Sequence, residues 1–161
     1  MRKSEDNAMA PALPRAGEGR RGEQGRLGYL LRQAGTAFRR RMERALADLA
    51  VTPPQFAVLT MLAAYPGASN ADIARLSMLA PQTVTVIVVN LERAGVVRRR
   101  AHAVHGRIRH IELTAAGTRL LARCRARVRA VERHVVAGLA ADEEQVVRRW
   151  LVRLALEGEV D

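Results

Sequence analysis

The chain has 161 residues, a formal net charge of +11 and a hydrophobic fraction of 48%. The length and the hydrophobic fraction fit one domain with an added dimerisation element. The positive charge indicates a polyanionic partner, with nucleic acid favoured over anionic membrane. A single cysteine, Cys124, excludes an internal disulfide and a Cys-rich zinc site, and an aromatic content of 3% disfavours a surface that stacks single-stranded bases. No apolar run approaches the roughly 20 residues of a membrane span, and the N-terminus lacks the apolar core of a secretory signal, so we expect a cytoplasmic protein.

The first 26 residues are rich in Pro, Gly, Arg and Glu and poor in apolar side chains. Such a segment buries too little apolar surface to offset its ordering entropy, so we predict a disordered tail over residues 1–26. The alternative is a basic arm that binds DNA. From residue 27 to residue 49 the apolar side chains recur at helical spacing, and arginines occupy the opposite face. This pattern predicts an amphipathic helix.

Capping signals divide the next stretch into short helices. Thr52 followed by Pro53 predicts an N-cap and the first turn of a helix that continues over 54–64 and is apolar on most faces. Ser69 with Asp72 predicts a capping box that opens a short second helix.

A third helix is predicted from Pro81 to about Ala94, where Gly95 is a C-terminal stop signal. Its valine-rich middle has β propensity, but the proline start and the glycine stop favour a helix. The side chains that should pack inward are Val84, Ile87, Val88 and Leu91. Those left for a DNA groove or for solvent are Gln82, Thr83, Thr85, Val86, Val89, Asn90 and Arg93.

Several of these outward residues have side chains suited to base edges. Gln82 can pair bidentately with adenine, and the methyl groups of Thr or Val can meet the thymine methyl. Asn90 and Arg93 come later in the helix and are predicted to approach phosphates. The alternative for Gln82 and Thr83 is a role as polar caps of the first turn.

Two extended segments, 96–101 and 107–113, predict a hairpin whose loop contains Gly106. Within twelve residues the hairpin carries five arginines and no acidic residue: Arg98, Arg99, Arg100, Arg107 and Arg109. A helix pair followed by a hairpin is the arrangement of a winged helix–turn–helix, in which the second helix enters the major groove and the hairpin reaches the backbone or minor groove. The alternative for the arginines is a solvated surface.

Two further helices are predicted after the hairpin. Thr114 caps the first, Cys124 lies on its apolar face and is expected in the core, and Gly138 ends it. The second begins with the acidic run 142–144 and has one apolar face. The predicted fold is therefore mainly α-helical with a small β-hairpin wing.

Four motifs in this order resemble those of the multiple-antibiotic-resistance regulator (MarR) family: 51–56, 81–84, 90–97 and 111–117. The resemblance covers about residues 27–156. It implies a homodimer built by interleaving the first helix and the last two helices, and repression through an inverted DNA repeat. It also implies relief of repression by a small, often anionic or phenolic ligand.

The resemblance names the segments and one site residue. It implies a dimerisation helix at 27–51, a winged helix–turn–helix DNA-binding domain at 52–114 and C-terminal dimerisation helices at 115–161. Arg107 inherits the minor-groove role of the family's wing arginine, although His105 stands where the family commonly has an aspartate. Val86 stands where many relatives have a polar or basic residue.

A small effector of unknown identity is expected, with no other cofactor. Its candidate contacts are the four aromatic residues Tyr29, Phe38, Phe56 and Tyr65, for which core packing is the alternative.

His102, His105 and His110 crowd the wing, but a metal among so many arginines is disfavoured, and DNA contact or simple exposure is expected instead. No catalytic motif is present in the sequence, so we expect no enzyme. The rival interpretation is an arginine-rich helical scaffold that binds RNA or anionic membrane without sequence specificity. A metal-sensing or metal-dependent enzyme ranks far below both.

Overall fold

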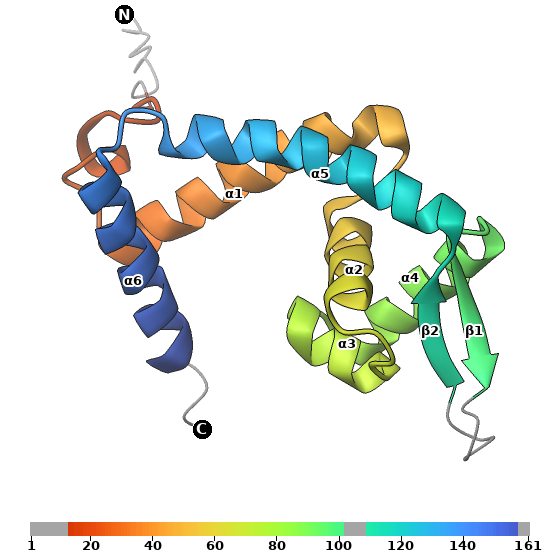
Figure 1. Ribbon diagram of the computed structural model, residues 1–161. Coiled ribbons are helices and arrows are strands. Elements are labelled where there is room, and N and C mark those ends of the chain that lie inside the picture. The colour runs from red at the N-terminus through yellow and green to blue at the C-terminus, as the bar shows by residue number, and fades with distance from the viewer. Residues whose placement is uncertain (1–12, 102–108, 158–161) are drawn as a thin grey trace, which may run out of the picture. The chain divides into compact units, whose positions relative to one another are not determined.

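The computed structural model describes residues 13–101 and 109–157 (Figure 1). The chain divides into two compact units, residues 1–38 and 39–161, whose boundary falls inside the first long helix.

The first unit contains a short 3-10 helix, η1 (Gly19–Arg21), and the beginning of helix α1 (Leu27–Leu46). The Arg21 guanidinium donates a hydrogen bond to the carbonyl oxygen of Pro14 at 2.8 Å, and the Gln33 amide donates to the carbonyl oxygen of Arg21 at 3.0 Å. Residues 13–26 therefore adopt defined turns beside α1, which differs from the disordered tail predicted for 1–26. Hydrogen bonds from long polar side chains order this stretch where apolar burial is scarce. Residues 1–12 lie outside the described residues.

The second unit begins with the end of α1 and a 3-10 turn, η2 (Ala47–Leu49), so the helix predicted to reach residue 49 ends three residues earlier. The remaining elements are α2 (Pro53–Ala64), α3 (Asn70–Ser77), α4 (Pro81–Arg93), β1 (Val97–Ala101), β2 (Arg109–Leu113), α5 (Ala115–Val136) and α6 (Ala141–Glu157). The two strands form an antiparallel sheet. The predicted mainly helical fold with a β-hairpin wing is confirmed.

Reciprocal caps fix the starts of two helices. At α2 the Thr52 hydroxyl accepts from the Gln55 amide N–H, and the Gln55 side chain accepts from the Thr52 N–H. At α3 Ser69 and Asp72 make the same exchange, as predicted. The Thr52 cap was predicted but its partner Gln55 was not, although the spacing from Thr52 to Gln55 is that of a capping box.

The main hydrophobic core joins α2, α3, α4, the base of the hairpin and the start of α5. All four residues predicted to face inward from α4 are buried: Val84, Ile87, Val88 and Leu91. Helical spacing of these apolar side chains overrides the β propensity of valine, because it places all four on the buried face. The opposite face of α4 stays exposed.

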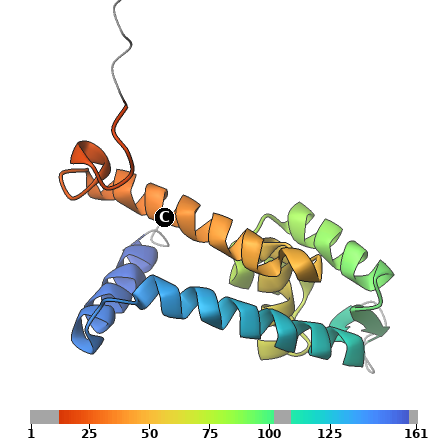
Figure 2. The ribbon, with the colours of Figure 1, turned by 90° about the horizontal axis from the view of Figure 1, so that it is seen from above.

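A second buried cluster joins the end of α1 to the middle of α5 and contains Met42, Leu46, Leu49, Val51, Cys124 and Val128. Cys124 is fully buried, which confirms its predicted place in the core, and this burial raises the pKa of its thiol. Figure 2 shows how the long helix α5 leads from the strands toward α6.

Helix α6 has the apolar face that the sequence predicts, but no residue of it from 141 to 156 is buried. Its exposed apolar side chains are Val146, Val147, Leu151, Val152, Leu154 and Leu156. In the described part of the chain no single helix is long and apolar enough to cross a membrane. Two sharply bent helix pairs, 27–49 with 53–64 and 70–77 with 81–93, meet the length and composition criteria only when taken together.

Candidate nucleic-acid interface

Helix α4 presents the predicted polar face to solvent. The six residues proposed to meet DNA from this helix are all exposed: Gln82, Thr83, Thr85, Val86, Asn90 and Arg93. Val86 leaves 60% of its surface in solvent, although it belongs to a helix whose other face forms the core. The Thr85 hydroxyl donates to the carbonyl oxygen of Pro81 at 3.0 Å, so this donor is already used. Contact of these side chains with DNA stays a prediction.

The turn between α3 and α4 exposes an apolar residue that was not predicted as part of the site. Met78 has a left-handed backbone, with φ of +52°, and 91% of its surface is exposed. Glycine is the usual sequence signal for this conformation, and a methionine gives none. Met78 is therefore an exposed apolar side chain on the turn of the helix–turn–helix, and its contact with DNA is a prediction.

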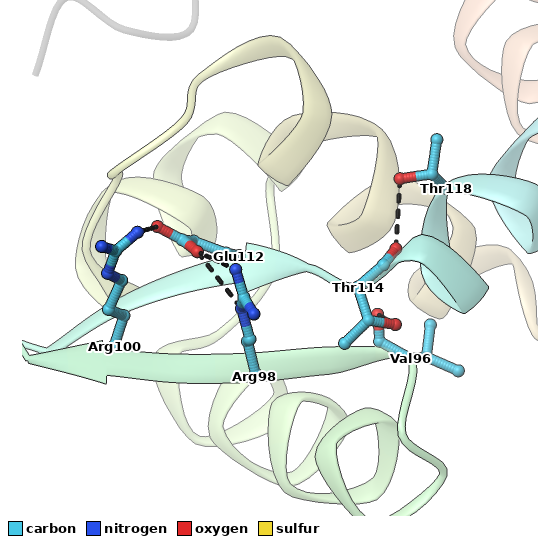
Figure 3. Close-up of polar contacts among 6 residues, drawn as sticks. All are labelled: Val96, Arg98, Arg100, Glu112, Thr114 and Thr118. Atoms are coloured by element: carbon cyan, nitrogen blue, oxygen red, sulfur yellow. Dashed lines mark hydrogen bonds and ion pairs between the residues drawn. The ribbon is translucent and has the colours of Figure 1, made fainter.

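The register of the hairpin decides which arginines of the wing share a face. Arg98 lies opposite Glu112, and Arg100 lies opposite His110. The Glu112 carboxylate accepts from Arg98 Nε at 3.3 Å and from Arg98 Nη2 at 3.2 Å, and its other oxygen lies 3.8 Å from Arg100 Nη1 (Figure 3). On the other face, Arg99 Nε lies 3.3 Å from the Glu92 carboxylate of α4.

Residues 98–109 hold five arginines and no acidic residue, and the counter-charges come from just outside that stretch. Three of the five have a carboxylate partner, because antiparallel pairing brings Glu112 opposite Arg98 and packing brings Glu92 beside Arg99. Arg109 pairs with Ala101 in the backbone register. Arg107, His102 and His105 lie outside the described residues, so the predicted groove role of Arg107 stays a prediction.

His110 ties the wing to the helical part of the domain. Its Nδ1 lies 2.6 Å from the carbonyl oxygen of Gly67, in the turn between α2 and α3, and the residue is half-buried. Gly67 has φ of +86°, a left-handed conformation that suits glycine. Simple exposure was therefore wrong for His110, because tertiary packing gives this ring a backbone partner.

The base of the wing is locked to the start of α5. The Thr114 hydroxyl donates to the Gly95 carbonyl oxygen at 2.7 Å and accepts from the Gly117 N–H at 3.1 Å. The Thr118 hydroxyl donates to the Thr114 carbonyl oxygen, as Figure 3 shows. A Cβ at Gly117 would lie 2.0 Å from the carbonyl oxygen of Val96. The joint between strand and helix therefore requires glycine there.

The four candidate ligand contacts occupy different surroundings. Phe56 packs against both hydrophobic clusters of the second unit, and Tyr65 ends α2 with half its surface exposed. Tyr29 and Phe38 belong to the first unit, where Tyr29 lines a cavity of about 480 Å³ with Arg20, Arg21, Gln24 and Arg26. The Arg32 guanidinium lies 5.7 Å from the Tyr29 ring centroid. Ligand contact by these residues stays a prediction.

Acidic, histidine and cysteine side chains do not gather into a metal site in the described ranges, where no group of three or more could hold an ion. Asp72 is bound instead by Ser69 and Arg75, and these hydrogen bonds lower its pKa from 3.8 to about 2. This carboxylate therefore serves the start of α3.

A short helix, a tight turn, an exposed second helix and a following arginine-bearing hairpin define a winged helix–turn–helix. The MarR family model matches residues 51–108. The HTH-type transcriptional repressor Rv2887 of Mycobacterium tuberculosis is 39% identical over 128 residues, which are 80% of this chain and 92% of the relative. The chain belongs to the MarR family.

Solved structures of Rv2887 have the same fold. Its complex with DNA matches with a TM-score of 0.66 and 36% identity, over 81% of this chain and 98% of that chain. Its complex with salicylic acid matches with a TM-score of 0.67 and 38% identity, over 82% of this chain and 98% of that chain.

Proposed function

We propose that this protein is a ligand-responsive transcriptional repressor that binds duplex DNA as a homodimer at an inverted repeat. The observation that carries the proposal is the two-faced helix α4, whose apolar side is buried while its polar side is exposed next to an arginine-bearing wing. The relative Rv2887 is named a repressor, and its structure with DNA supports the same role here.

Helix α4 is narrow enough for the major groove, where Gln82 would pair with adenine and the Val86 methyl groups would meet a thymine methyl. Arg93, Arg98, Arg107 and Arg109 would bind phosphates or the minor groove. The proposal includes no catalytic step and places the protein in the cytoplasm.

The apolar faces left uncovered on α6 support self-association. A second copy would cover these side chains, and an unpartnered apolar face of this extent is costly on a small domain. Two-fold symmetry would then place the two recognition helices about one helical turn apart, roughly 10 base pairs. The matching operator is an inverted repeat with that spacing.

We infer a small aromatic anion as the class of effector. The support is the complex of Rv2887 with salicylic acid. A basic protein whose arginines lie on several helices offers partners for a carboxylate. The effector is expected to lower operator affinity when it binds.

The deciding experiment is a gel-shift titration against the upstream DNA of the protein's own gene at several salt concentrations. The proposal expects binding to that DNA well above binding to a scrambled duplex of equal length, with a steep fall as salt rises. Equal affinity for any duplex, or preference for single-stranded RNA or for vesicles of anionic lipid, would favour the scaffold alternative. Addition of salicylate in the same assay tests the effector class.

A further inference from the structure

We propose that Glu112 limits the attraction of the wing for DNA phosphates by occupying Arg98 and Arg100, and so weakens sequence-independent binding. The inference rests on the proposed function as a duplex-DNA-binding protein. It assigns a positioning role to an acidic residue on the wing of a basic protein.

The geometry places one carboxylate between two guanidinium groups. Arg98 is its direct cross-strand neighbour, and Arg100 lies two residues along the same strand and therefore on the same face. Each Glu112 oxygen has a different arginine partner, at 3.2 Å for Arg98 and 3.8 Å for Arg100. Together the three side chains carry a net charge of +1 instead of +2.

Exposure makes these pairs replaceable. The side chains of Arg98 and Arg100 are 63% and 70% exposed, whereas that of Glu112 is 31% exposed. Ion pairs this open to solvent contribute little to stability, so a DNA phosphate can compete with the carboxylate for either guanidinium. A phosphate that binds either guanidinium also comes within a few ångströms of the Glu112 carboxylate. Salt screens charges only beyond about 8 Å under physiological conditions, so the carboxylate repels that phosphate.

Sequence-independent binding depends on such phosphate contacts for nearly all of its free energy. A wing with two unengaged arginines would therefore hold the repressor on any duplex, whereas a wing with Glu112 releases it more readily. Base contacts from α4 do not involve Glu112, because that helix presents its own exposed side chains.

The test compares the wild type with Glu112→Gln on a non-operator duplex, by fluorescence anisotropy between 50 and 200 mM KCl. We expect E112Q to bind about threefold to tenfold more tightly at the lower salt, with a logarithmic salt slope steeper by roughly one to two units, since each freed arginine adds about 0.9. Circular dichroism melting checks that the substituted protein is folded.

Glu144→Gln is the matched control. Glu144 is also 31% exposed and also pairs with an arginine, Arg148, but it lies on α6 and away from the wing. Both substitutions raise the net charge by one, so a general charge effect would be equal in the two variants. Equal binding by E112Q and E144Q would overturn the inference.

A second comparison tests whether Glu112 acts through the two arginines. In a chain that already carries Arg98→Gln and Arg100→Gln, the further change E112Q should raise affinity much less than it does in the wild type. An equal gain in affinity in both backgrounds would show that Glu112 does not act through Arg98 and Arg100, and would overturn the inference. If the wild type binds no duplex at any salt, the proposed function fails, whereas wild-type binding with no E112Q effect refutes the inference alone.

Discussion

The imidazole Nδ1 of His110 lies 2.6 Å from the carbonyl oxygen of Gly67 and joins the second strand of the wing to the turn between α2 and α3. Because a carbonyl oxygen only accepts hydrogen bonds, Nδ1 carries the proton in this contact. The wing is therefore held at its base by Thr114 and again along β2 by His110.

Replacing His110 by alanine should remove this tether. We expect His110→Ala to lower the free energy of unfolding by about 1 kcal/mol, the usual contribution of one hydrogen bond together with a partly buried ring. Thermal unfolding measures the change. His134→Ala, at an exposed position on α5, is the control, and an equal loss in both variants would contradict the tether.

Gly117→Ala should be strongly destabilising. The new Cβ would lie 2.0 Å from the carbonyl oxygen of Val96, so the joint between β1 and α5 must move, at a cost of about 1–3 kcal/mol or more. Gly35→Ala is the matched control in α1, where a Cβ meets nothing within 4 Å. That change should instead stabilise the helix by up to about 1 kcal/mol. Chemical denaturation of both variants tests the opposite signs.

Ala50→Gly should stabilise the protein. Ala50 is exposed and has φ of +51°, a left-handed conformation that costs a residue with a Cβ about 1–2 kcal/mol. Glycine removes that strain, and its greater freedom in the unfolded chain offsets part of the gain. Ala94→Gly, at an exposed right-handed position, should lower the melting temperature. A fall in both variants would refute the strain at residue 50.

Acid should weaken the cap of α3. The pKa of Asp72 is lowered from 3.8 to about 2, chiefly by the Ser69 hydroxyl and then by Arg75. A lowered pKa in the folded state means that the stabilising effect is complete above pH 3.8 and is lost as the pH falls toward 2. The difference in melting temperature between the wild type and Asp72→Asn should therefore narrow from pH 5 to pH 2. A constant difference in melting temperature from pH 5 to pH 2 would contradict a stabilising role of the ionised Asp72 in this cap.

Two residues of α4 should separate base recognition from phosphate binding. Gln82→Ala should weaken operator binding by about tenfold or more and leave non-operator binding nearly unchanged. Arg93→Gln should weaken both and reduce the salt slope by about one unit. Titrations on both duplexes at several salt concentrations distinguish the two. A uniform loss for Gln82→Ala would make that side chain a cap of the first turn.

The helices of the fold were largely predictable because their signals are local. Thr52, Ser69 and Thr114 mark helix starts, and the spacing of Val84, Ile87, Val88 and Leu91 marks a buried face. The η1 turns were not predicted, because Arg21 and Gln33 order that stretch through hydrogen bonds that leave no periodic pattern.

The site was predicted only in part, because its electrostatics depend on pairing across the chain. The sequence places Glu112 within the predicted hairpin, but only the strand register shows that it lies opposite Arg98. The contact of His110 with Gly67 spans 43 positions and depends on how the sheet packs on the turn. The exposed side of α4 needed only helical periodicity and was therefore predicted.

The burial of Cys124 makes the protein well suited to site-directed labelling. Its thiol is fully buried and its pKa is raised, so a thiol-reactive spin label should leave it unmodified in the folded chain. Met78→Cys would then place a reactive thiol on the turn before α4, at a position that is 91% exposed. The mobility of a label at that position would report directly whether the helix–turn–helix is bound to a duplex or free in solution.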